Sequence, residues 1–359
     1  MTFKIENHLK RSYLLLTLLM VVAGCMKDDD WVKAHLMQTS VELPAGSIFI
    51  VNEGNFMYGN ATLSSYDTLK RAVQNDIFYK VNGLPLGDVA ESMSRWKSSG
   101  FVVVNNSGKI YVMDTSSGKY TGKITGLTSP RYIHIINDQK AYVSDLYAGK
   151  ISIVNPTTKQ ITGFVPCPSH PSTEEMVLFG KYLFVTCWSA DKTILVIDTD
   201  KDQVIREIAV GVQPCGIVSD HNGKIWVLCQ SLPGNNTSGV AMLQRIDPNN
   251  YSIEMSLSFP AGAKPVKLTI DGKGEYLFYL LGNKVYKMEV SANQLPGQAL
   301  LSPVSSLLYG LGVDPVSGDI YVSDALDYQQ SGVISRFSAS GSLIGTFKAG
   351  IIPGSFCFR

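Results

Sequence analysis

Few residues of this chain have the types and spacing that catalysis or metal binding requires. No HExxH, GxSxG, P-loop or EF-hand spacing is present among its 359 residues. His170, in the segment PCPSHPS, could act as a base or a metal ligand, but a single histidine between prolines is more often structural. Glu174 and Glu175 would hold a cation if both faced one channel, yet neighbours in a strand point to opposite faces. The sequence therefore predicts a binding protein without a catalytic residue, a metal or a cofactor.

The cysteines after Cys25 are odd in number and contain no CxxC pair. They are Cys167, Cys187, Cys215, Cys229 and Cys357. At least one is therefore expected to be free, and most lie in apolar runs, where cysteine packs as a small apolar side chain. A bridge from Cys187 to Cys215 or to Cys167 stays open.

Aromatic and amide side chains are concentrated in predicted turns. Trp188, in TCWSADKT, lies between two apolar runs, where it would contact a ligand or partner or else cover the core. The turns NEGNFMYGNA, QSLPGNNTSG and DALDYQQSG are longer than usual hairpin turns, and long loops on a rigid scaffold commonly bind. The candidate ligand-binding residues are Asn52, Glu53, Asn55, Phe56, Tyr58, Asn105, Asn106, Arg131, Asp145, Tyr147, His170, Trp188, Gln230, Asp324 and Tyr328. Such a set suits a large, amide-bearing or sugar-like ligand better than a small anion.

Strands must position these turns, and from residue 47 onward one unit of strands recurs seven times. The copies of its most apolar strand read SIFIVN, GFVVVN, KAYVSD, KYLFVTC, KIWVLC, EYLFYLL and DIYVSD, spaced 40 to 53 residues apart. A period near 40 with about four strands per unit is typical of a propeller blade. Val, Ile and Tyr dominate the runs, and Gly, Asn or Pro interrupts them about every ten residues, which excludes a helical fold.

A further short run stands before each unit after the first, and one more run, IPGSFCFR, follows the last unit. We predict that this run supplies the innermost strand of the blade opened by SIFIVN, which closes the ring and removes both exposed sheet edges. The predicted fold is all-β, a seven-bladed β-propeller over residues 47–359. A pair of β-sandwiches or a right-handed β-helix is the alternative.

Alignment of the seven apolar strands gives one equivalent position per blade. These positions hold Asn52, Asn105, Asp145, Cys187, Cys229, Leu281 and Asp324. The polar members fall in four consecutive blades, which predicts that one side of the ring is polar. Asn and Asp also bond the backbone that follows them in turns, so a local role stays open at each position.

The charges and the N-terminus bear on partners and location. The chain has 31 Lys+Arg against 30 Asp+Glu, scattered along the sequence, which excludes a basic footprint for nucleic acid. The chain begins with basic residues, an apolar run and AGC, which is the pattern of a secretion signal. The apolar run is too short to span a membrane. VAGC resembles the lipobox of bacterial lipoproteins, which implies acylation of Cys25, and a plain signal peptide is the alternative. We expect a signal at 1–24, an acylated tether at 25–46 and the propeller after it.

Several segments resemble known families. MKDDDW resembles the lysine-plus-acidic export tag of Bacteroidetes-type lipoproteins, which implies a lipid-anchored protein exposed on the outer membrane. AYVSD, IYVSD, VIDTD and RIDP resemble the YVTN propellers. The chain also resembles a group of surface lipoproteins that includes cobalamin-capturing propellers seated on a TonB-dependent transporter. The segments that carry this resemblance, together with the lipobox and the acidic tag, are FIVNEGNFMYGNATLSSYD, GLPLGDVAESM and FVVVNNSGKIYVMD.

That resemblance implies capture of cobalamin or a related corrinoid as a transported ligand rather than a cofactor, with the outer-membrane transporter as partner. Two other functions stay open. One is a protein- or glycan-binding propeller at the cell surface, and the other is a metal-dependent propeller lyase or lactonase that uses His170.

Overall fold

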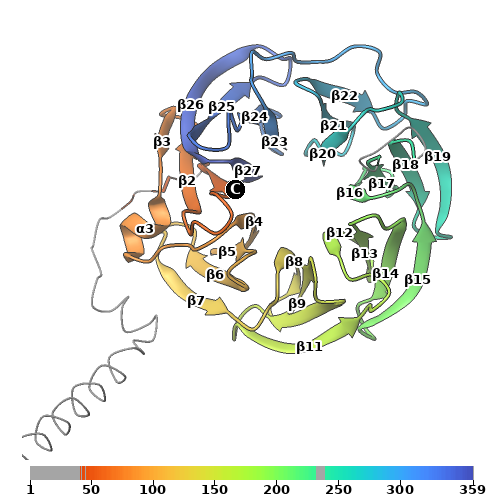
Figure 1. The fold of residues 1–359 in the computed structure, drawn as a ribbon, viewed down its shortest axis with the longest axis horizontal. Helices are drawn as coiled ribbons and strands as arrows, with labels where there is room; N and C mark the ends of the chain where they lie inside the picture. Colours follow the sequence, from red (N-terminus) through yellow and green to blue (C-terminus); the bar gives the residue numbers. More distant parts are fainter. Residues whose placement is uncertain (1–40, 42, 45, 232–238, 359) are drawn as a thin grey trace, which may run out of the picture.

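The computed structural model describes residues 41–358 except 42, 45 and 232–238. The predicted signal, Cys25 and most of the predicted tether lie outside these residues, as does most of the loop QSLPGNNTSG. The described residues form seven antiparallel sheets arranged around a central axis, as Figure 1 shows. The predicted seven-bladed β-propeller is confirmed, and the sandwich and β-helix alternatives are wrong.

Each sheet runs outward from the axis, and its strands fall into four radial positions. The innermost strands are β27 (Pro353–Cys357), β4 (Ala90–Trp96), β8 (Pro130–Asn137), β12 (Thr173–Phe179), β16 (Pro214–Ser219), β20 (Pro265–Ile270) and β23 (Leu308–Val313). The second strands are β1 (Ile48–Asn52), β5 (Ser99–Val104), β9 (Lys140–Asp145), β13 (Tyr182–Cys187), β17 (Ile225–Cys229), β21 (Tyr276–Leu281) and β24 (Ile320–Asp324). The third strands are β2 (Thr62–Asp67), β6 (Lys109–Asp114), β10 (Lys150–Asn155), β14 (Thr193–Asp198), β18 (Met242–Asp247), β22 (Val285–Glu289) and β25 (Ser331–Phe337). The outer strands are β3 (Ala72–Gln74), β7 (Tyr120–Ile124), β11 (Gln160–Pro166), β15 (Gln203–Ala209), β19 (Ser252–Ser258) and β26 (Leu343–Ile351).

The C-terminal strand closes the ring as predicted. β27 pairs antiparallel with β1, so that Phe49 lies opposite Cys357 and Ile50 opposite Phe356. Gly54 N–H also donates to the carbonyl of Ile351 at 3.1 Å. The first sheet therefore takes its innermost strand from one end of the chain and its other strands from the opposite end.

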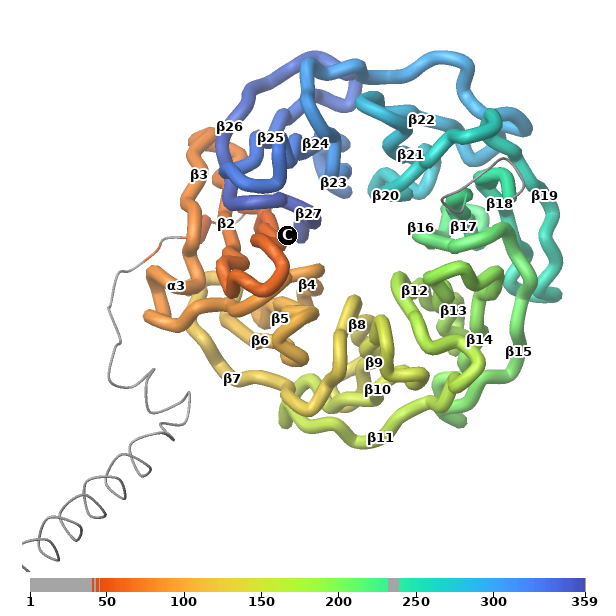
Figure 2. The backbone as a smooth tube through the Cα atoms, viewed as in Figure 1, coloured from red at the N-terminus to blue at the C-terminus, as the bar shows by residue number. Residues whose placement is uncertain are grey.

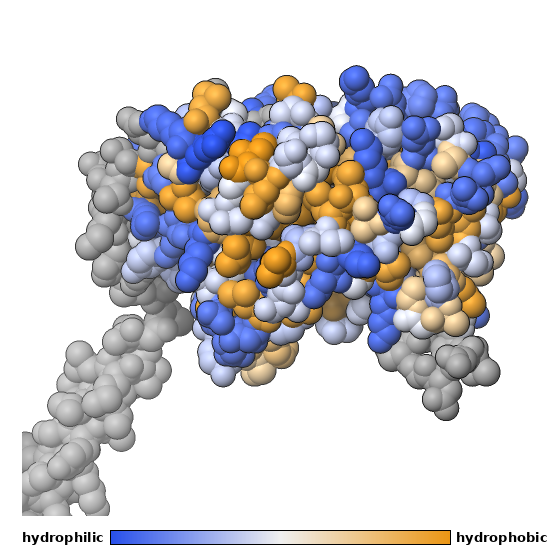
Figure 3. Space-filling model, turned by 90° about the horizontal axis from the view of Figure 1, so that it is seen from above, coloured by the Kyte–Doolittle hydropathy of each residue, from blue (hydrophilic) through white to orange (hydrophobic). Residues whose placement is uncertain are grey.

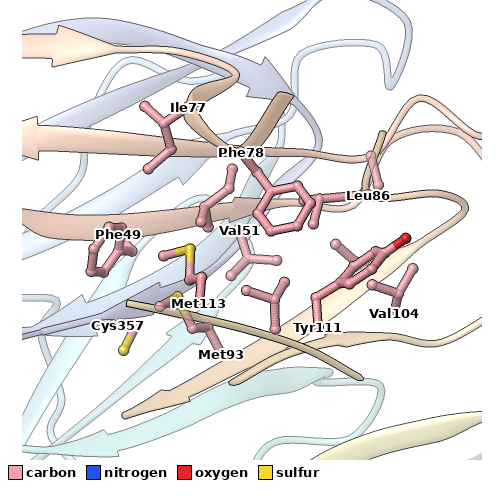
Figure 4. Close-up of a cluster of buried hydrophobic side chains, with 14 of the residues drawn as sticks. Phe49, Val51, Ile77, Phe78, Leu86, Met93, Val104, Tyr111, Met113 and Cys357 are labelled. Atoms are coloured by element: carbon pink, nitrogen blue, oxygen red, sulfur yellow. The ribbon is translucent and has the colours of Figure 1, made fainter. Parts of the chain in front are cut away.

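The core consists of apolar side chains packed between neighbouring sheets. Between the first two sheets, Phe49 and Val51 of β1 pack with Met113 of β6, and the rings of Phe78 and Tyr111 lie 5.0 Å apart (Figure 4). Burial of each such side chain contributes about 1.5–3 kcal/mol. Because the second strands are covered on both faces, they read as continuous apolar runs and not as alternating ones.

Two features depart from the predicted repeat. The sheet formed by β20, β21 and β22 has three strands, and only an isolated bridge from Val285 to Leu301 extends it. A short helix, α3 (Ile77–Asn82), lies at the rim beside β2 and ends at Gly83, whose φ of 63° suits glycine (Figure 1).

The outer surface is mixed in character. Figure 3 views the ring from its rim and shows hydrophilic and hydrophobic residues interspersed over this side. In the described part of the chain, none of the helices has the length and apolar character needed to cross a membrane.

Candidate functional site

The site begins with an irregularity that all seven innermost strands share. The pairing register with the second strand shifts at Ala90/Ser92, Pro130/Ile133, Thr173/Met176, Pro214/Gly216, Val266/Thr269, Leu308/Leu311 and opposite Val51/Asn52. Such a bulge places an extra residue on one strand, so strict alternation of side chains is lost there. Glu174 and Glu175 consequently line the same cavity. The expectation that these neighbours must face opposite sides was therefore wrong.

The bulged ends of the innermost strands surround a cavity of about 410 Å³ at the axis. Figure 2 shows these strands converging on the centre of the ring. Its ionisable lining is Glu53, Glu91, Arg131, Glu174, Glu175 and Lys267, together with the phenols of Tyr132 and Tyr309. Four carboxylates against two cations disfavour a small anion and favour a polar ligand that donates hydrogen bonds.

Arg131 connects three consecutive sheets across one side of the cavity. Its Nε donates to both carboxylate oxygens of Glu174 on β12 at 2.9 Å, and its Nη1 donates to Glu91 on β4. The side chains are 20%, 7% and 7% exposed for Arg131, Glu91 and Glu174, so the ion pairs are largely removed from solvent. Burial opposes the charge of Arg131, but the two carboxylates outweigh it and raise its pKa. The guanidinium is therefore a fixed cation in the cavity wall.

Glu53 lies across the cavity, where the sheet is closed. The Tyr309 hydroxyl donates to Glu53 Oε2 at 2.9 Å, and Lys267 Nζ lies 5.5 Å from the centroid of the Tyr309 ring. Gly354 makes this possible, because a Cβ at that position would overlap Glu53 Oε1. The absence of a side chain at Gly354 thus leaves room for the close approach of the Glu53 carboxylate.

Burial makes three of these carboxylates unusually weak acids. It raises the pKa of Glu175 to about 7, against a hydrogen bond from the Ile217 N–H at 3.1 Å that lowers it. Burial and the charge of Glu91 raise the pKa of Glu53, and burial raises the pKa of Glu174 despite Arg131. The charge of the cavity therefore changes near neutral pH.

The rest of the lining includes several apolar groups and one indole ring. Cys215, Val266, Leu308 and Trp188 supply them, and Trp188 is half-buried. The cavity thus combines charged and apolar groups, which is the usual make-up of a site for a small organic ligand.

Four of the predicted ligand-binding residues line this cavity. They are Glu53, Arg131, Trp188 and Gln230. The amide of Gln230 is held in place because its Oε1 accepts a hydrogen bond from Gln213 Nε2 at 2.8 Å.

The polar residues at the ends of the second strands have a different environment. Asn52, Asn105, Asp145 and Asp324 are all buried. Asn52 bonds Ser64, Thr62 and the Gly350 N–H, and Asn105 donates to the carbonyls of residues 129 and 130. Asp145 and Asp324 accept backbone N–H groups of the adjacent turns. These contacts are bonds to nearby backbone and side-chain groups, which is the local role that the sequence left open as an alternative to ligand binding.

The other predicted residues lie on the same face, outside the cavity. Phe56, Tyr58 and Tyr147 are 64%, 78% and 71% exposed. Asn55 Nδ2 donates to the carbonyl of Tyr328 at 2.5 Å, which joins the first and last blades. The Tyr328 ring makes an edge contact with Tyr309, and Asn106 donates to Asp88. These residues form a polar and aromatic margin around the cavity mouth.

His170 also lies outside the cavity lining. Its Nδ1 is 2.7 Å from Asp191 Oδ2, and the imidazole is buried. Cys167, Cys187 and Cys215 are free thiols, so neither bridge considered for Cys187 is formed.

Sequence reasoning missed Glu91, Tyr132, Lys267 and Tyr309, and it rejected the joint use of Glu174 and Glu175. These residues were overlooked because the second strands were aligned in place of the innermost ones. The signal that could have found them is the second residue of each innermost strand. These residues are Glu91, Arg131, Glu174, Cys215, Val266, Tyr309 and Gly354. Four of these seven positions carry a charged or phenolic group.

A larger cavity, of about 730 Å³, lies at the opposite face between the sheets of β4–β7 and β8–β11. Trp96, Asp138 and Asn155 are among its lining residues, and Lys97 pairs there with Asp138 in a largely exposed bridge. We favour the smaller axial cavity because residues from every blade converge on it and because its charged groups are buried.

Sequence comparison identifies one domain family. Residues 46–349 match the family described as "Domain of unknown function (DUF5074)". No curated protein matches the chain.

Solved structures share the fold at low sequence identity. A quinonprotein alcohol dehydrogenase-like protein from Bacteroides thetaiotaomicron is 14% identical, with a TM-score of 0.64 over 89% of this chain and 79% of that one. A periplasmic gluconolactonase from Pseudomonas aeruginosa is 14% identical, with a TM-score of 0.63 over 87% and 99%. A Lactobacillus plantarum protein is also 14% identical, with a TM-score of 0.66 over 88% and 100%. At this identity the likeness shows the fold alone.

Proposed function

The chain belongs to the DUF5074 family, and we propose that it is a binding protein whose axial cavity captures an amide-bearing ligand, with cobalamin or a related corrinoid as the leading candidate. The observation that supports this most directly is the mixed wall of the cavity. Buried carboxylates, a fixed guanidinium and an ammonium line the cavity together with Trp188 and apolar groups.

The donors and acceptors of this wall match those of an amide group. Carboxylates accept from an amide NH₂, while Lys267 and the N–H groups of Arg131 not used by Glu91 and Glu174 donate to an amide carbonyl. A corrinoid carries such amides around an apolar macrocycle. The amides would bond the charged groups of the cavity, and the macrocycle would lie against Trp188.

The size of the cavity implies that the exposed aromatic residues around it also contact the ligand. A cavity of about 410 Å³ is within the range for small-molecule sites, but it is too small to enclose a whole corrinoid. The part of the ligand outside the cavity would contact Phe56, Tyr58 and Tyr147, whose rings are exposed on this face. Because the strands hold these turns in place, little ordering is needed on binding.

Binding is tested by soaking the purified chain in cyanocobalamin, removing free ligand on a desalting column and recording the visible spectrum. We expect a coloured protein with one ligand per chain. Trp188→Ala should weaken binding at least 10-fold, whereas Trp96→Ala, on the opposite face, should leave it unchanged. A colourless wild-type protein would rule out the corrinoid.

Delivery to a transporter belongs to the same proposal and rests on the resemblance of VAGCMKDDDW to an exported lipoprotein leader. Two or more acyl chains on Cys25 would hold the protein at the membrane, and the propeller would pass its ligand to a TonB-dependent partner. Cys25→Ser is expected to release the protein from the membrane fraction. Equal retention of the variant and the wild type would contradict acylation.

A second candidate function is glycan or protein binding at the cell surface. The exposed side chains of Phe56, Met57 and Tyr58, at 64%, 77% and 78%, favour it. It predicts that Tyr58→Ala weakens retention on a glycan or partner column while Trp188→Ala does not, whereas the corrinoid proposal requires Trp188→Ala to weaken binding.

A further inference from the structure

A second cluster of metal-binding side chains lies beside the cavity wall and goes beyond the proposed capture function. Donor atoms of His170, Cys187 and Asp191 all lie within 4.8 Å of one another. His170 belongs to the loop before β12, Cys187 is the last residue of β13, and Asp191 lies in the turn that follows. The loop before β12 and the turn after β13 thus bring an imidazole, a thiol and a carboxylate together within one blade.

We infer that His170, Cys187 and Asp191 form a binding site for a zinc-class divalent cation. A thiolate with imidazole and carboxylate is a donor set that Zn²⁺ accepts, whereas Ca²⁺ and Mg²⁺ prefer oxygen alone. Tetrahedral Zn²⁺ holds its donors roughly 3.5 Å apart, so the site closes by small side-chain adjustments. Binding would release the thiol proton of Cys187 to solvent.

The surroundings of the imidazole fit this assignment. Nδ1 is the ring nitrogen on the side of Asp191, at 2.7 Å, and Nε2 lies 3.5 Å from Glu207 Oε1. A carboxylate on the second nitrogen is the usual way to orient a metal-binding histidine. Cys187 is fully buried, while the side chains of His170 and Asp191 are 11% and 15% exposed, so the ion would enter from their side.

The cation would act on the turn that carries Trp188. Cys187 and Asp191 bracket this turn, and its residues Ser189 and Ala190 have φ values of 60° and 69°, in the left-handed region. That backbone is unfavourable for residues with a Cβ, so the turn needs support from its surroundings. An ion that joins both ends of the turn to His170 would fix Trp188 in the cavity wall.

The decisive experiment measures zinc binding to the full-length protein after removal of metal with a chelator. Calorimetry and metal analysis are expected to find one Zn²⁺ per chain, and Co²⁺ is expected to give a sulfur-to-metal charge-transfer band. Cys187→Ser should remove that band and weaken affinity at least 100-fold. The matched control is Cys229→Ser, because Cys229 is the last residue of the next blade's second strand, equally buried and 3.8 Å from Gln244.

Two further measurements keep the result decisive. If Cys187→Ser does not fold, His170→Gln serves instead, with His221→Gln as its control on an exposed turn. Zn²⁺ should change the fluorescence of the wild type and not of Trp188→Phe. Absence of bound zinc, or equal zinc binding by the Cys187 and Cys229 variants, would overturn the site. Cobalamin binding is measured separately, so neither result would decide the proposed capture function.

Discussion

Two rings of residues lie close to one another on the same face, and they use their polar side chains in opposite ways. The first ring is formed by the last residues of the second strands and includes Asn52 and Asp145, whose side chains are buried and bonded to nearby backbone and hydroxyl groups. The second ring is formed by the bulged residues of the innermost strands and includes Glu91, Arg131 and Glu174, which face the axial cavity. Polarity alone therefore does not mark a site, whereas polarity at a backbone irregularity that opens to a cavity does.

The largest expected effect on stability comes from removing Arg131, the cation that joins Glu91 and Glu174 in the second ring. Arg131→Met leaves Glu91 and Glu174 buried without their cation, which should lower the free energy of unfolding by about 3 kcal/mol at pH 8. The loss should shrink at pH 5, because the raised pKa of Glu174 leaves that carboxyl protonated there. Chemical denaturation at the two pH values measures both quantities.

The control for this variant is an exposed ion pair. Lys97 lies 2.5 Å from Asp138 with side chains 65% and 52% exposed, so Lys97→Met should cost less than about 1 kcal/mol. Equal losses in the two variants would show that the Arg131 bridge does not stabilise the ring.

Asn52→Ala is the corresponding test of the first ring. It removes the partners of Ser64 Oγ and of the Gly350 N–H, which bond Asn52 at 2.9 and 3.0 Å. We expect a loss of about 1–3 kcal/mol in thermal unfolding and unchanged ligand affinity. Glu91→Gln should do the reverse, with weaker binding and a smaller loss of stability. A drop in affinity in Asn52→Ala would remove the distinction between the rings.

Much of this architecture could be predicted, because each blade repeats the same apolar second strand and because IPGSFCFR has no blade after it. The blade of β20–β22 could not be predicted as three-stranded, since the expectation came from the period and not from the Pro- and Ser-containing stretch that replaces its outer strand. Glu174 and Glu175 were misjudged because simple alternation applies only to regular strands. A bulge is a product of the whole sheet and of its pairing, so single-strand patterns do not reveal it.

Glu175→Gln tests the raised pKa of this carboxyl in the cavity wall. The folded protein holds the proton up to about pH 7, whereas the unfolded chain releases it near pH 4.5, so stability falls as the pH rises through this window. Glutamine does not ionise, so the variant lacks this loss of stability, and its side-chain oxygen can still accept from the Ile217 N–H. We expect a gain on the order of 1–2 kcal/mol at pH 8 and no gain below pH 4.5. Glu289→Gln, at an exposed position, is the control, and an equal gain there would contradict the effect of burial.

The smallest stability effect, and the sharpest comparison, concerns Gly354. Alanine at this position would push Glu53 away from the Tyr309 hydroxyl, but the atom it displaces is the end of a flexible side chain, so the free energy of unfolding should change by less than about 1 kcal/mol. Ligand affinity should fall about 5-fold, the worth of one hydrogen bond. Gly345→Ala, which has no neighbouring atom within 4 Å of the added Cβ, should change neither quantity. Titration with cobalamin and thermal unfolding of the two variants would separate the roles of the rings, because a change in affinity without a change in stability is what a cavity residue produces and a turn-capping residue does not.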